Sequence, residues 1–316
     1  MKRKIRKLLF ELSNNCRIST KQLGKKINSS QQSASYLVRQ LEKKRKIKYY
    51  TLVDPVKLGY VNIIVGFDYL NFEREAKKQV IDKLLATEQV IRVEEATQGV
   101  DLVVEYCASN LSSFNKTHSD IIYKFRKILQ TKFILTVIVK HIYAKNYLVN
   151  GRNDTDLIIC GDRETRKLSE NDMKVLRELI ANPVETFSSM SKNTKVSVKS
   201  IIKSKKRLEK FSVIRGYSCF IDEPKFGIRR YFIFLNLAGY GVEEIRKLQE
   251  FALTNKNIVE MVKTIGNYQI MLIVEELNKT ELIKELRSQF PVEKYFVVEV
   301  DKIHLLRYFP LEAINI

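Results

Sequence analysis

Five residues near the N-terminus can form hydrogen bonds with nucleic-acid bases and occur at helical spacing. They are Gln31, Gln32, Ser35, Tyr36 and Arg39. Residues three or four positions apart share one face of a helix, so these side chains are expected to point in one direction. Amide, hydroxyl and guanidinium groups can donate to and accept from the edges of base pairs in the major groove. The pattern therefore predicts a helix that contacts bases.

Basic residues follow this face and recur later in the chain. Lys43, Lys44 and Arg45 come directly after it. A second helix of the same kind is predicted over residues 197–210, and its candidate DNA contacts are Ser197, Lys199, Ser200, Lys203, Lys206 and Arg207. Lysine and arginine bind phosphates and gain affinity by displacing condensed counterions. These residues are expected to hold the DNA backbone.

The excess positive charge is confined to the two segments that contain these helices. Residues 1–50 contain 15 Lys and Arg against 2 Asp and Glu, and residues 166–217 contain 13 against 5. The rest of the chain is nearly balanced, with 28 against 29, although the whole chain carries +20. Charge localised in this way indicates a phosphate-rich partner rather than general solubility.

The two basic segments belong to a repeat with an offset of about 167 residues. Four landmarks recur in the same order: residues 41–43 match 208–210, 47–50 match 214–217, 54–59 match 222–227, and 97–99 match 264–266. The offset is far longer than that of a solenoid repeat. The chain is therefore predicted to be a duplicated pair of domains.

Each copy begins with the pattern of a winged helix-turn-helix domain. In the first copy, Ala34, Leu37, Val38 and Leu41 place an apolar stripe on a third helix that Ser30 can cap. A strand over residues 47–53 is expected to form the wing. In the second copy Val198, Ile201 and Leu208 are expected to face inward. However, Ser204 and Lys205 replace the apolar pair, so this helix is less regular and is predicted to bind backbone rather than bases.

The remainder of each copy alternates strands and helices in the order βαββαβ, a ferredoxin-like arrangement. The predicted fold class is α+β, with two winged helix-turn-helix and two ferredoxin-like domains. The predicted boundaries are 1–54 and 58–146 in the first copy, a linker at 147–167, and 168–221 and 228–310 in the second copy. Within the linker, the apolar residues 157–160 predict an extra strand.

Catalytic and metal-binding patterns are absent from the sequence. His118, His141 and His304 show no metal-ligand or triad spacing, and the four cysteines lie far apart. No catalytic residue, metal or cofactor is predicted. The dispersed cysteines predict a reducing cytoplasm, and the lack of an apolar run of 18 residues predicts no transmembrane helix.

The chain resembles a tandem member of the Lrp/AsnC (feast/famine) transcriptional regulators of the archaeal type. Residues 41–50 and 54–59 carry the resemblance in the first copy, and residues 168–176 and 213–217 carry it in the second. The resemblance implies double-stranded DNA as the partner. It also implies an amino-acid or related effector near the turn between the second and third strands of each ferredoxin-like domain. On this sequence the implied effector residues are Thr97, Gly99, Asp101, Thr264, Gly266 and Tyr268.

Two alternatives to an effector-controlled regulator stay open. Some proteins with this domain pair decarboxylate tetrapyrroles of the siroheme type, and His141 and His304 would then be the candidate residues, although their offset is 163. The other alternative is a nucleic-acid-binding protein without an effector. RNA is disfavoured because the predicted sheets lack an aromatic and basic face for stacked bases.

The duplication also predicts that the chain pairs with itself, as an intramolecular pseudo-dimer that can build larger homo-oligomers. The open sheet of one copy is expected to cover that of the other. The predicted covering residues are Ile63, Val65, Phe67, Val103 and Ile138 on one side and Phe232, Phe234, Met271, Ile273 and Val298 on the other.

Overall fold

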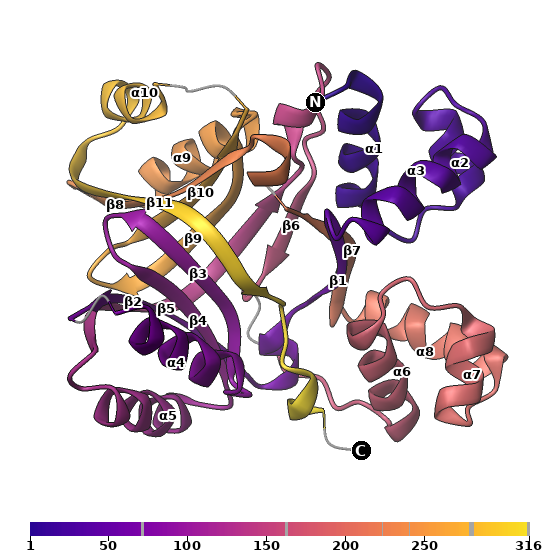
Figure 1. Cartoon of the computed structure of the whole chain (residues 1–316), viewed down its shortest axis with the longest axis horizontal. Helices are drawn as coiled ribbons and strands as arrows, with labels where there is room; N and C mark the ends of the chain where they lie inside the picture. The colour runs from indigo at the N-terminus through magenta and orange to yellow at the C-terminus, as the bar shows by residue number, and fades with distance from the viewer. Residues whose placement is uncertain (71–72, 162–163, 223, 240, 278–280, 315–316) are drawn as a thin grey trace.

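The protein consists of a β-barrel flanked by helices and, on one side of it, two three-helix units that we call the first and second heads (Figure 1). The computed structural model describes residues 1–70, 73–161, 164–222, 224–239, 241–277 and 281–314. The first head contains α1 (Arg3–Asn14), α2 (Thr20–Lys26) and α3 (Gln31–Lys43). The second head contains α6 (Glu170–Ala181), α7 (Phe187–Thr194) and α8 (Val198–Lys210).

Side-chain caps fix where the head helices begin. Ser30 accepts a hydrogen bond from the backbone N–H of Ser33, and Ser197 does the same for Ser200 at the start of α8. Each cap satisfies a backbone donor that has no partner within its helix. The predicted start of α3 at Ser30 is therefore confirmed.

Both ferredoxin-like domains show the predicted βαββαβ order. The first contains β2 (Val61–Tyr69), α4 (Arg74–Leu85), β3 (Val90–Gln98), β4 (Leu102–Ala108), α5 (Leu111–Lys124) and β5 (Leu129–Tyr143). The second contains β8 (Arg229–Leu237), α9 (Val242–Thr254), β9 (Ile258–Gly266), β10 (Ile270–Glu276), α10 (Leu282–Gln289) and β11 (Val292–Leu306). Four short 3-10 turns precede or follow these domains: η1 (Pro55–Leu58), η2 (Asn146–Leu148), η3 (Pro224–Phe226) and η4 (Leu311–Ala313).

The two four-stranded sheets join at both edges and close into one eight-stranded barrel. The order around the barrel is β2-β4-β3-β11-β8-β10-β9-β5, and β5 pairs again with β2. All these pairings are antiparallel. Strands β5 and β11, with 15 residues each, pair with their own sheet first and with the other copy's sheet afterwards. The expectation of two stacked sheets is corrected here, because the sheets join edge to edge, β3 with β11 and β9 with β5, and close into a barrel.

The barrel interior is lined by Val103, Phe232, Phe234, Met271, Ile273 and Val298, as predicted. The prediction was wrong for Ile63, Val65 and Phe67, which pack outward in the same cluster as residues of α4 and α5. The neighbouring Ile64 faces the interior instead. One face of β2 carries Ile63, Val65 and Phe67, whereas the other carries Asn62, Ile64 and Asp68. The alternation of side chains therefore identified the apolar face, but it could not show that helices α4 and α5, rather than the other copy's sheet, cover that face. Ile138 is also 38% exposed, at an irregularity in the pairing of β5 with β9.

The strands that leave the two heads pair with each other. Strand β1 (Ile47–Val53) runs antiparallel to β7 (Ile214–Ile221). The wing predicted within one copy is thus a two-stranded sheet made by both copies. Strand β6 (Asp156–Ile159) adds to β5, which confirms the extra strand predicted in the linker. The four cysteines, all among the described residues, are buried and form no disulfide, and burial raises the pKa of Cys16 to about 12.

Candidate nucleic-acid interface

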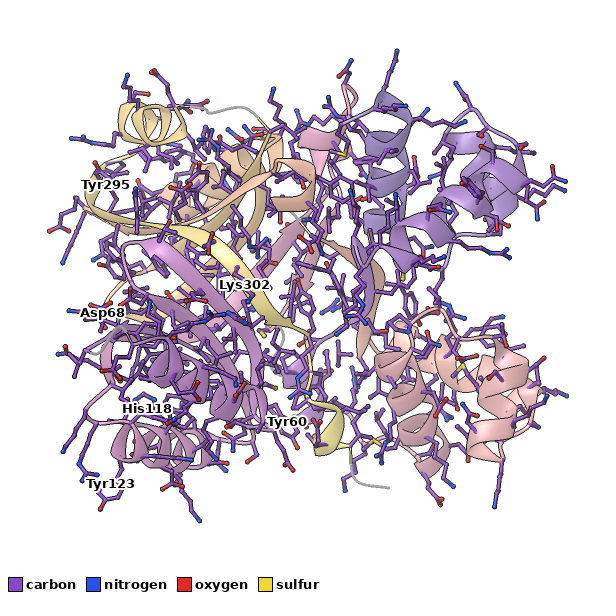
Figure 2. The ribbon with its side chains drawn as sticks, viewed as in Figure 1. Tyr60, Asp68, His118, Tyr123, Tyr295 and Lys302 are labelled. Carbon is purple, nitrogen blue, oxygen red and sulfur yellow. The ribbon has the colours of Figure 1, made fainter. Side chains whose placement is uncertain are left out.

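The two heads lie next to each other on the side of the molecule away from the barrel, and polar side chains radiate from them (Figures 1 and 2). Arg17, in the loop after α1, connects them. Its guanidinium donates to the carbonyl oxygens of Pro183 (2.5 Å) and Glu185 (3.1 Å) and lies over the ring of Phe187. The heads are therefore in direct contact and present a single surface.

Each head is also tied to the strand that leaves the other head. The hydroxyl of Thr51 on β1 donates to the carbonyl of Leu179 in α6, and Ser218 on β7 donates to the carbonyl of Ser13 in α1. Helix α1 packs against β7, and α6 packs against β1. These crossed contacts hold the heads in a fixed relation to the barrel and to each other.

Helix α3 presents most of the predicted base contacts to solvent. Gln31, Gln32 and Arg39 are exposed, Ser35 is partly exposed, and 63% of Tyr36 is exposed. Its opposite face is anchored by Ala34 and Leu41, which are buried. Gly24 in α2 allows the close turn before α3, because a Cβ there would lie 2.9 Å from the carbonyl oxygen of Ser29. Lys43, Lys44 and Arg45 are exposed at the end of α3.

Helix α8 presents a different set of side chains. Ser197, Lys199, Lys203 and Lys206 are exposed, and Ser200 is partly exposed. Ile201 and Leu208 are buried as predicted, together with Ser204. The prediction was wrong for Val198, which is 39% exposed at the first position of the helix. The α8 surface therefore offers cations where α3 offers amides and a phenol.

Two basic residues of α8 make contacts inside the second head. Arg207 donates to the carboxylate of Asp172 at the start of α6 and to the hydroxyl of Ser169. Hydrogen bonds from Arg207 and Ser169 overcome the effect of burial and lower the pKa of Asp172. Lys205, which replaces an apolar residue of the first copy, is partly buried and pairs with Glu209, so its charge has a partner. The guanidinium of Arg207, a predicted DNA contact, is therefore already bound by Asp172 and Ser169 of the same head.

The glycines of the two predicted effector turns lie where the copies meet. A Cβ on Gly99 would lie 2.6 Å from the carbonyl oxygen of Val297 in β11, and one on Gly266 would lie 2.4 Å from that of Ile134 in β5. Both glycines have positive φ angles. Their small size is thus required by the approach of the other copy. Tyr268 packs with Phe133, Phe234 and Phe296, while Thr264 is buried and Thr97 is exposed.

Asp101 and Gln269 make equivalent hydrogen bonds in the two copies. The carboxylate of Asp101 accepts from the backbone N–H of Tyr69 (2.7 Å), and the amide oxygen of Gln269 accepts from that of Leu237 (2.9 Å). Both side chains therefore complete the backbone bonding at the end of a strand. Effector binding by these turns stays a prediction.

A network of buried charges fills the end of the barrel nearest the heads, and no motif in the sequence indicated it. Arg92 on β3 lies 3.2 Å from both carboxylate oxygens of Glu260 on β9, and Arg230 on β8 pairs with Glu94 on β3 at 3.0 Å. Lys140 on β5 binds Glu105 on β4. The interior ion pairs therefore connect the two copies as well as strands within each one.

Arg92 and Glu260 are equivalent residues of the two copies, since each is the third residue of its strand. Equivalent residues meet only next to the pseudo-two-fold axis that relates the copies. In a symmetric dimer of either copy, two arginines or two glutamates would meet there. The salt bridge therefore favours pairing of the first copy with the second.

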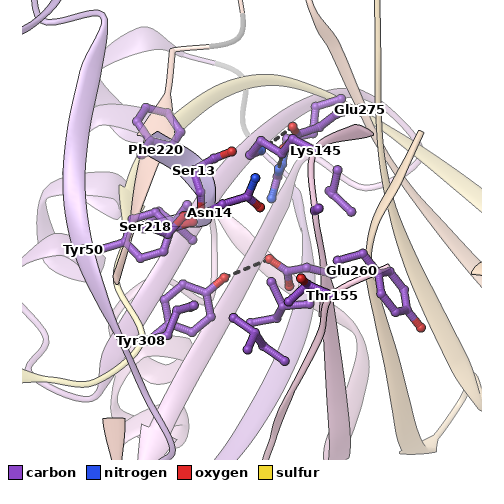
Figure 3. Close-up of a pocket in the computed structure, with 18 residues that line it drawn as sticks. Ser13, Asn14, Tyr50, Lys145, Thr155, Ser218, Phe220, Glu260, Glu275 and Tyr308 are labelled. Atoms are coloured by element: carbon purple, nitrogen blue, oxygen red, sulfur yellow. Dashed lines mark hydrogen bonds and ion pairs between the residues drawn. The ribbon is translucent and has the colours of Figure 1, made fainter. Parts of the chain in front are cut away.

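A small cavity of about 80 Å³ lies between this network and the heads. Asn14 from the end of α1, Tyr50 from β1 and Ser218 from β7 face it from one side (Figure 3). Glu260 and Glu275 line the barrel side, and the Tyr308 hydroxyl donates to Glu260 at 3.0 Å. The cavity thus joins the barrel interior to the strands that position the heads.

Curated relatives match one copy of the repeat. An uncharacterized HTH-type transcriptional regulator of Pyrococcus furiosus is 30% identical over 129 residues, which are 39% of this chain and 82% of the relative. The regulatory protein AsnC of Haemophilus influenzae is 30% identical over 138 residues, or 43% of this chain and 87% of that protein. The chain belongs to the Lrp/AsnC family. The winged helix-turn-helix DNA-binding family also matches residues 1–48.

The tandem arrangement of this Lrp/AsnC chain has a counterpart among solved structures. The siroheme decarboxylase NirDL aligns with 97% of this chain and 94% of its own, at a TM-score of 0.60 and 14% identity. At that identity the similarity describes the fold. None of the described helices has the length and apolar character needed to cross a membrane.

The structure also places His141 and His304 at equivalent positions, each the thirteenth residue of a 15-residue strand. The offset of 163 had suggested otherwise. The His141 ring contacts Asp156 at 2.7 Å and Gln249 at 3.1 Å, and the His304 ring contacts Glu95 at 3.0 Å. His118 is buried against Phe114 and Phe67, and desolvation lowers its pKa.

Proposed function

We propose that this chain is a sequence-specific, DNA-binding transcriptional regulator that carries both heads of a family dimer in one polypeptide. The observation that supports this most strongly is the pair of adjacent heads, each with an exposed helix, α3 or α8. The excess positive charge of the chain lies in the two segments that contain these heads, residues 1–50 and 166–217. Two heads fixed at one distance can contact two half-sites on the same face of a duplex.

The two heads are proposed to play different roles. Helix α3 offers Gln32, Tyr36 and Arg39, which suit base edges, whereas α8 offers Lys199, Lys203 and Lys206, which suit phosphates. The preferred site should consequently be asymmetric, with one half-site more strongly specified. Binding should depend steeply on salt, with a log–log slope of about −5 if roughly six phosphates are neutralised.

The experiment is selection of bound sequences from a random duplex library, followed by footprinting of the selected site and titration at several salt concentrations. An asymmetric footprint with two unlike half-sites, about one helical turn or a multiple apart, is the expected result. A palindromic footprint would contradict the division of roles. Affinity that does not change with salt would contradict DNA binding by these surfaces.

A small effector is proposed as a further property of the regulator. The family resemblance implies that the effector binds at the turns that contain Gly99 and Gly266. The turn at Gly99 also contains the acidic Asp101 and the exposed Thr97. An amino-acid or related ligand that binds there would act where the copies meet, next to β11. Thermal-shift screening of free amino acids, repeated on Thr97→Ala, tests this; no stabilisation by any of them would contradict it.

A second candidate function rests on the fold shared with NirDL along nearly the whole chain and on the equivalent placement of His141 and His304. It is decarboxylation of a siroheme-type tetrapyrrole. Titration with an iron tetrapyrrole distinguishes the two functions, because binding would shift the Soret absorption band. Loss of that shift in His141→Ala and His304→Ala would support the enzyme, and no shift with wild-type protein would contradict it.

A further inference from the structure

The two copies differ at the end of their last long strand. In the first copy, residues 140–143 of β5 pair with β6 on one edge, and residues 140–142 also pair with β9 on the other. In the second copy, the equivalent residues 303–306 of β11 pair with β3 on one edge only. Pairing of β11 with β8 ends at Val300, and no described strand takes the place of β6. An unpaired strand edge exposes backbone N–H and C=O groups that can accept another strand.

The position of β6 in the first copy shows what this edge can hold. Strand β6 contributes the apolar residues Leu157, Ile158 and Ile159. The strand is anchored just past its end, where the backbone N–H of Cys160 donates to the buried carboxylate of Asp54 at 3.1 Å. Leu157 and Leu52 of β1 both approach Gly216 of β7. A Cβ on Gly216 would lie 3.3 Å from Leu52 and 3.4 Å from Leu157.

The second copy keeps the residues that surround such a strand. Asp222 is the equivalent of Asp54: the backbone N–H of Asp54 donates to the carbonyl of Val213, and that of Asp222 donates to the carbonyl of Lys46. Asp222 lines a cleft of about 160 Å³ together with Phe220, Arg230 and residues 300–303 of β11. Its carboxylate is 25% exposed and pairs with Lys225, whereas that of Asp54 is fully buried. Lys302, labelled in Figure 2, is exposed on this part of β11.

We propose that the free edge of β11 is a docking site for an extended peptide from a partner protein, which adds a strand in the way that β6 adds to β5. The peptide would run antiparallel to β11 and carry two or three aliphatic residues, as β6 does. One of its backbone N–H groups would donate to Asp222, and an aliphatic side chain would contact Phe220. Strand addition of this kind obtains affinity from backbone hydrogen bonds and specificity from alternate side chains.

The chain supplies its own probe for this site. A fluorescent peptide with the sequence of residues 154–161, in which Cys160→Ser prevents oxidation, is titrated into the full-length protein and followed by anisotropy. Saturable binding is expected, and it should weaken about tenfold in Asp222→Ala, which removes a charged hydrogen-bond acceptor. Asp68→Ala is the matched control, because Asp68 is also 25% exposed and ion-paired, with Lys132 on a distant part of the barrel. A peptide with Ile158→Pro cannot complete the strand pairing and should not bind.

Hydrogen exchange locates the bound peptide. Slower exchange of the backbone amides of residues 303–306, with residues 140–143 unchanged, is the expected result. Protection at residues 140–143 instead would mean that the probe displaces β6, and it would overturn the proposal. Failure of the wild-type protein to bind the peptide, or equal binding by Asp222→Ala and wild type, would overturn it as well. None of these measurements involves DNA, so they are independent of the proposed function.

Discussion

Replacing Glu260 with glutamine should destabilise the whole barrel. The Glu260 carboxylate accepts hydrogen bonds from the guanidinium of Arg92 and the hydroxyl of Tyr308, and all three side chains are buried. Burial acts to raise the pKa of Glu260, but Arg92, Lys140 and Arg230 outweigh it and hold the pKa at about 2. The difference from the ordinary value of 4.5 corresponds to about 3 kcal/mol in favour of the charged form. Removing one partner of a buried pair is expected to cost about 3–5 kcal/mol.

The assay is chemical denaturation at neutral pH of wild type, Glu260→Gln, Arg92→Met and the double variant. Both single variants should unfold at markedly lower denaturant concentration. The double variant should cost less than the sum of the two, because it leaves fewer unpaired buried charges. The pair between Glu243 and Arg246 on α9 is the control, since both side chains are more than half exposed. Breaking it should leave the midpoint unchanged within error.

The same variant tests the dependence of stability on pH. Because the folded-state pKa of Glu260 lies below its unfolded value, its stabilisation is present above pH 4.5 and is lost as pH falls toward about 2. Wild type should therefore lose more stability than Glu260→Gln over that range. If Glu260→Gln shifted the midpoint no more than the α9 control, or if both proteins had the same acid profile, the reasoning about the buried network would be refuted.

Three further outcomes are expected. Gln32→Ala should relax sequence preference at one or two base pairs by about 1–3 kcal/mol, whereas Lys44→Ala should weaken all sequences alike, as measured by competition binding. Gly266→Ala should lower the free energy of unfolding by about 2 kcal/mol, because its Cβ would meet the Ile134 carbonyl. Gly151→Ala, which meets open space, is its control, and equal melting temperatures would contradict the steric argument. Arg17→Ala should weaken binding to a complete two-half-site duplex while leaving a single half-site unaffected, and equal losses on both duplexes would contradict a bridging role.

The helices of the heads could be predicted because their determinants are local. Ser30 and Ser197 each cap a helix through a residue three positions away, and the apolar stripe of α3 repeats every three or four residues. The duplication was also evident from motifs at one offset. Both kinds of signal are contained in the chain order itself, so no tertiary contact was needed to find them.

The tertiary structure alone decided how the two copies meet. The alternation in β2 shows that Ile63 lies on its apolar face, but only the position of α4 and α5 showed that this face points outward and that Ile64 points inward. Arg92 and Glu260 are ordinary charges in the sequence, and they become a buried pair only because the barrel brings β3 and β9 together near the pseudo-two-fold axis. The pairings of β1 with β7 and of β11 with β3 likewise join residues more than 150 positions apart. The second of these pairings decides which edge of β11 stays free. A periodicity of two or 3.6 residues carries no information about partners at that distance, so these features required the folded chain.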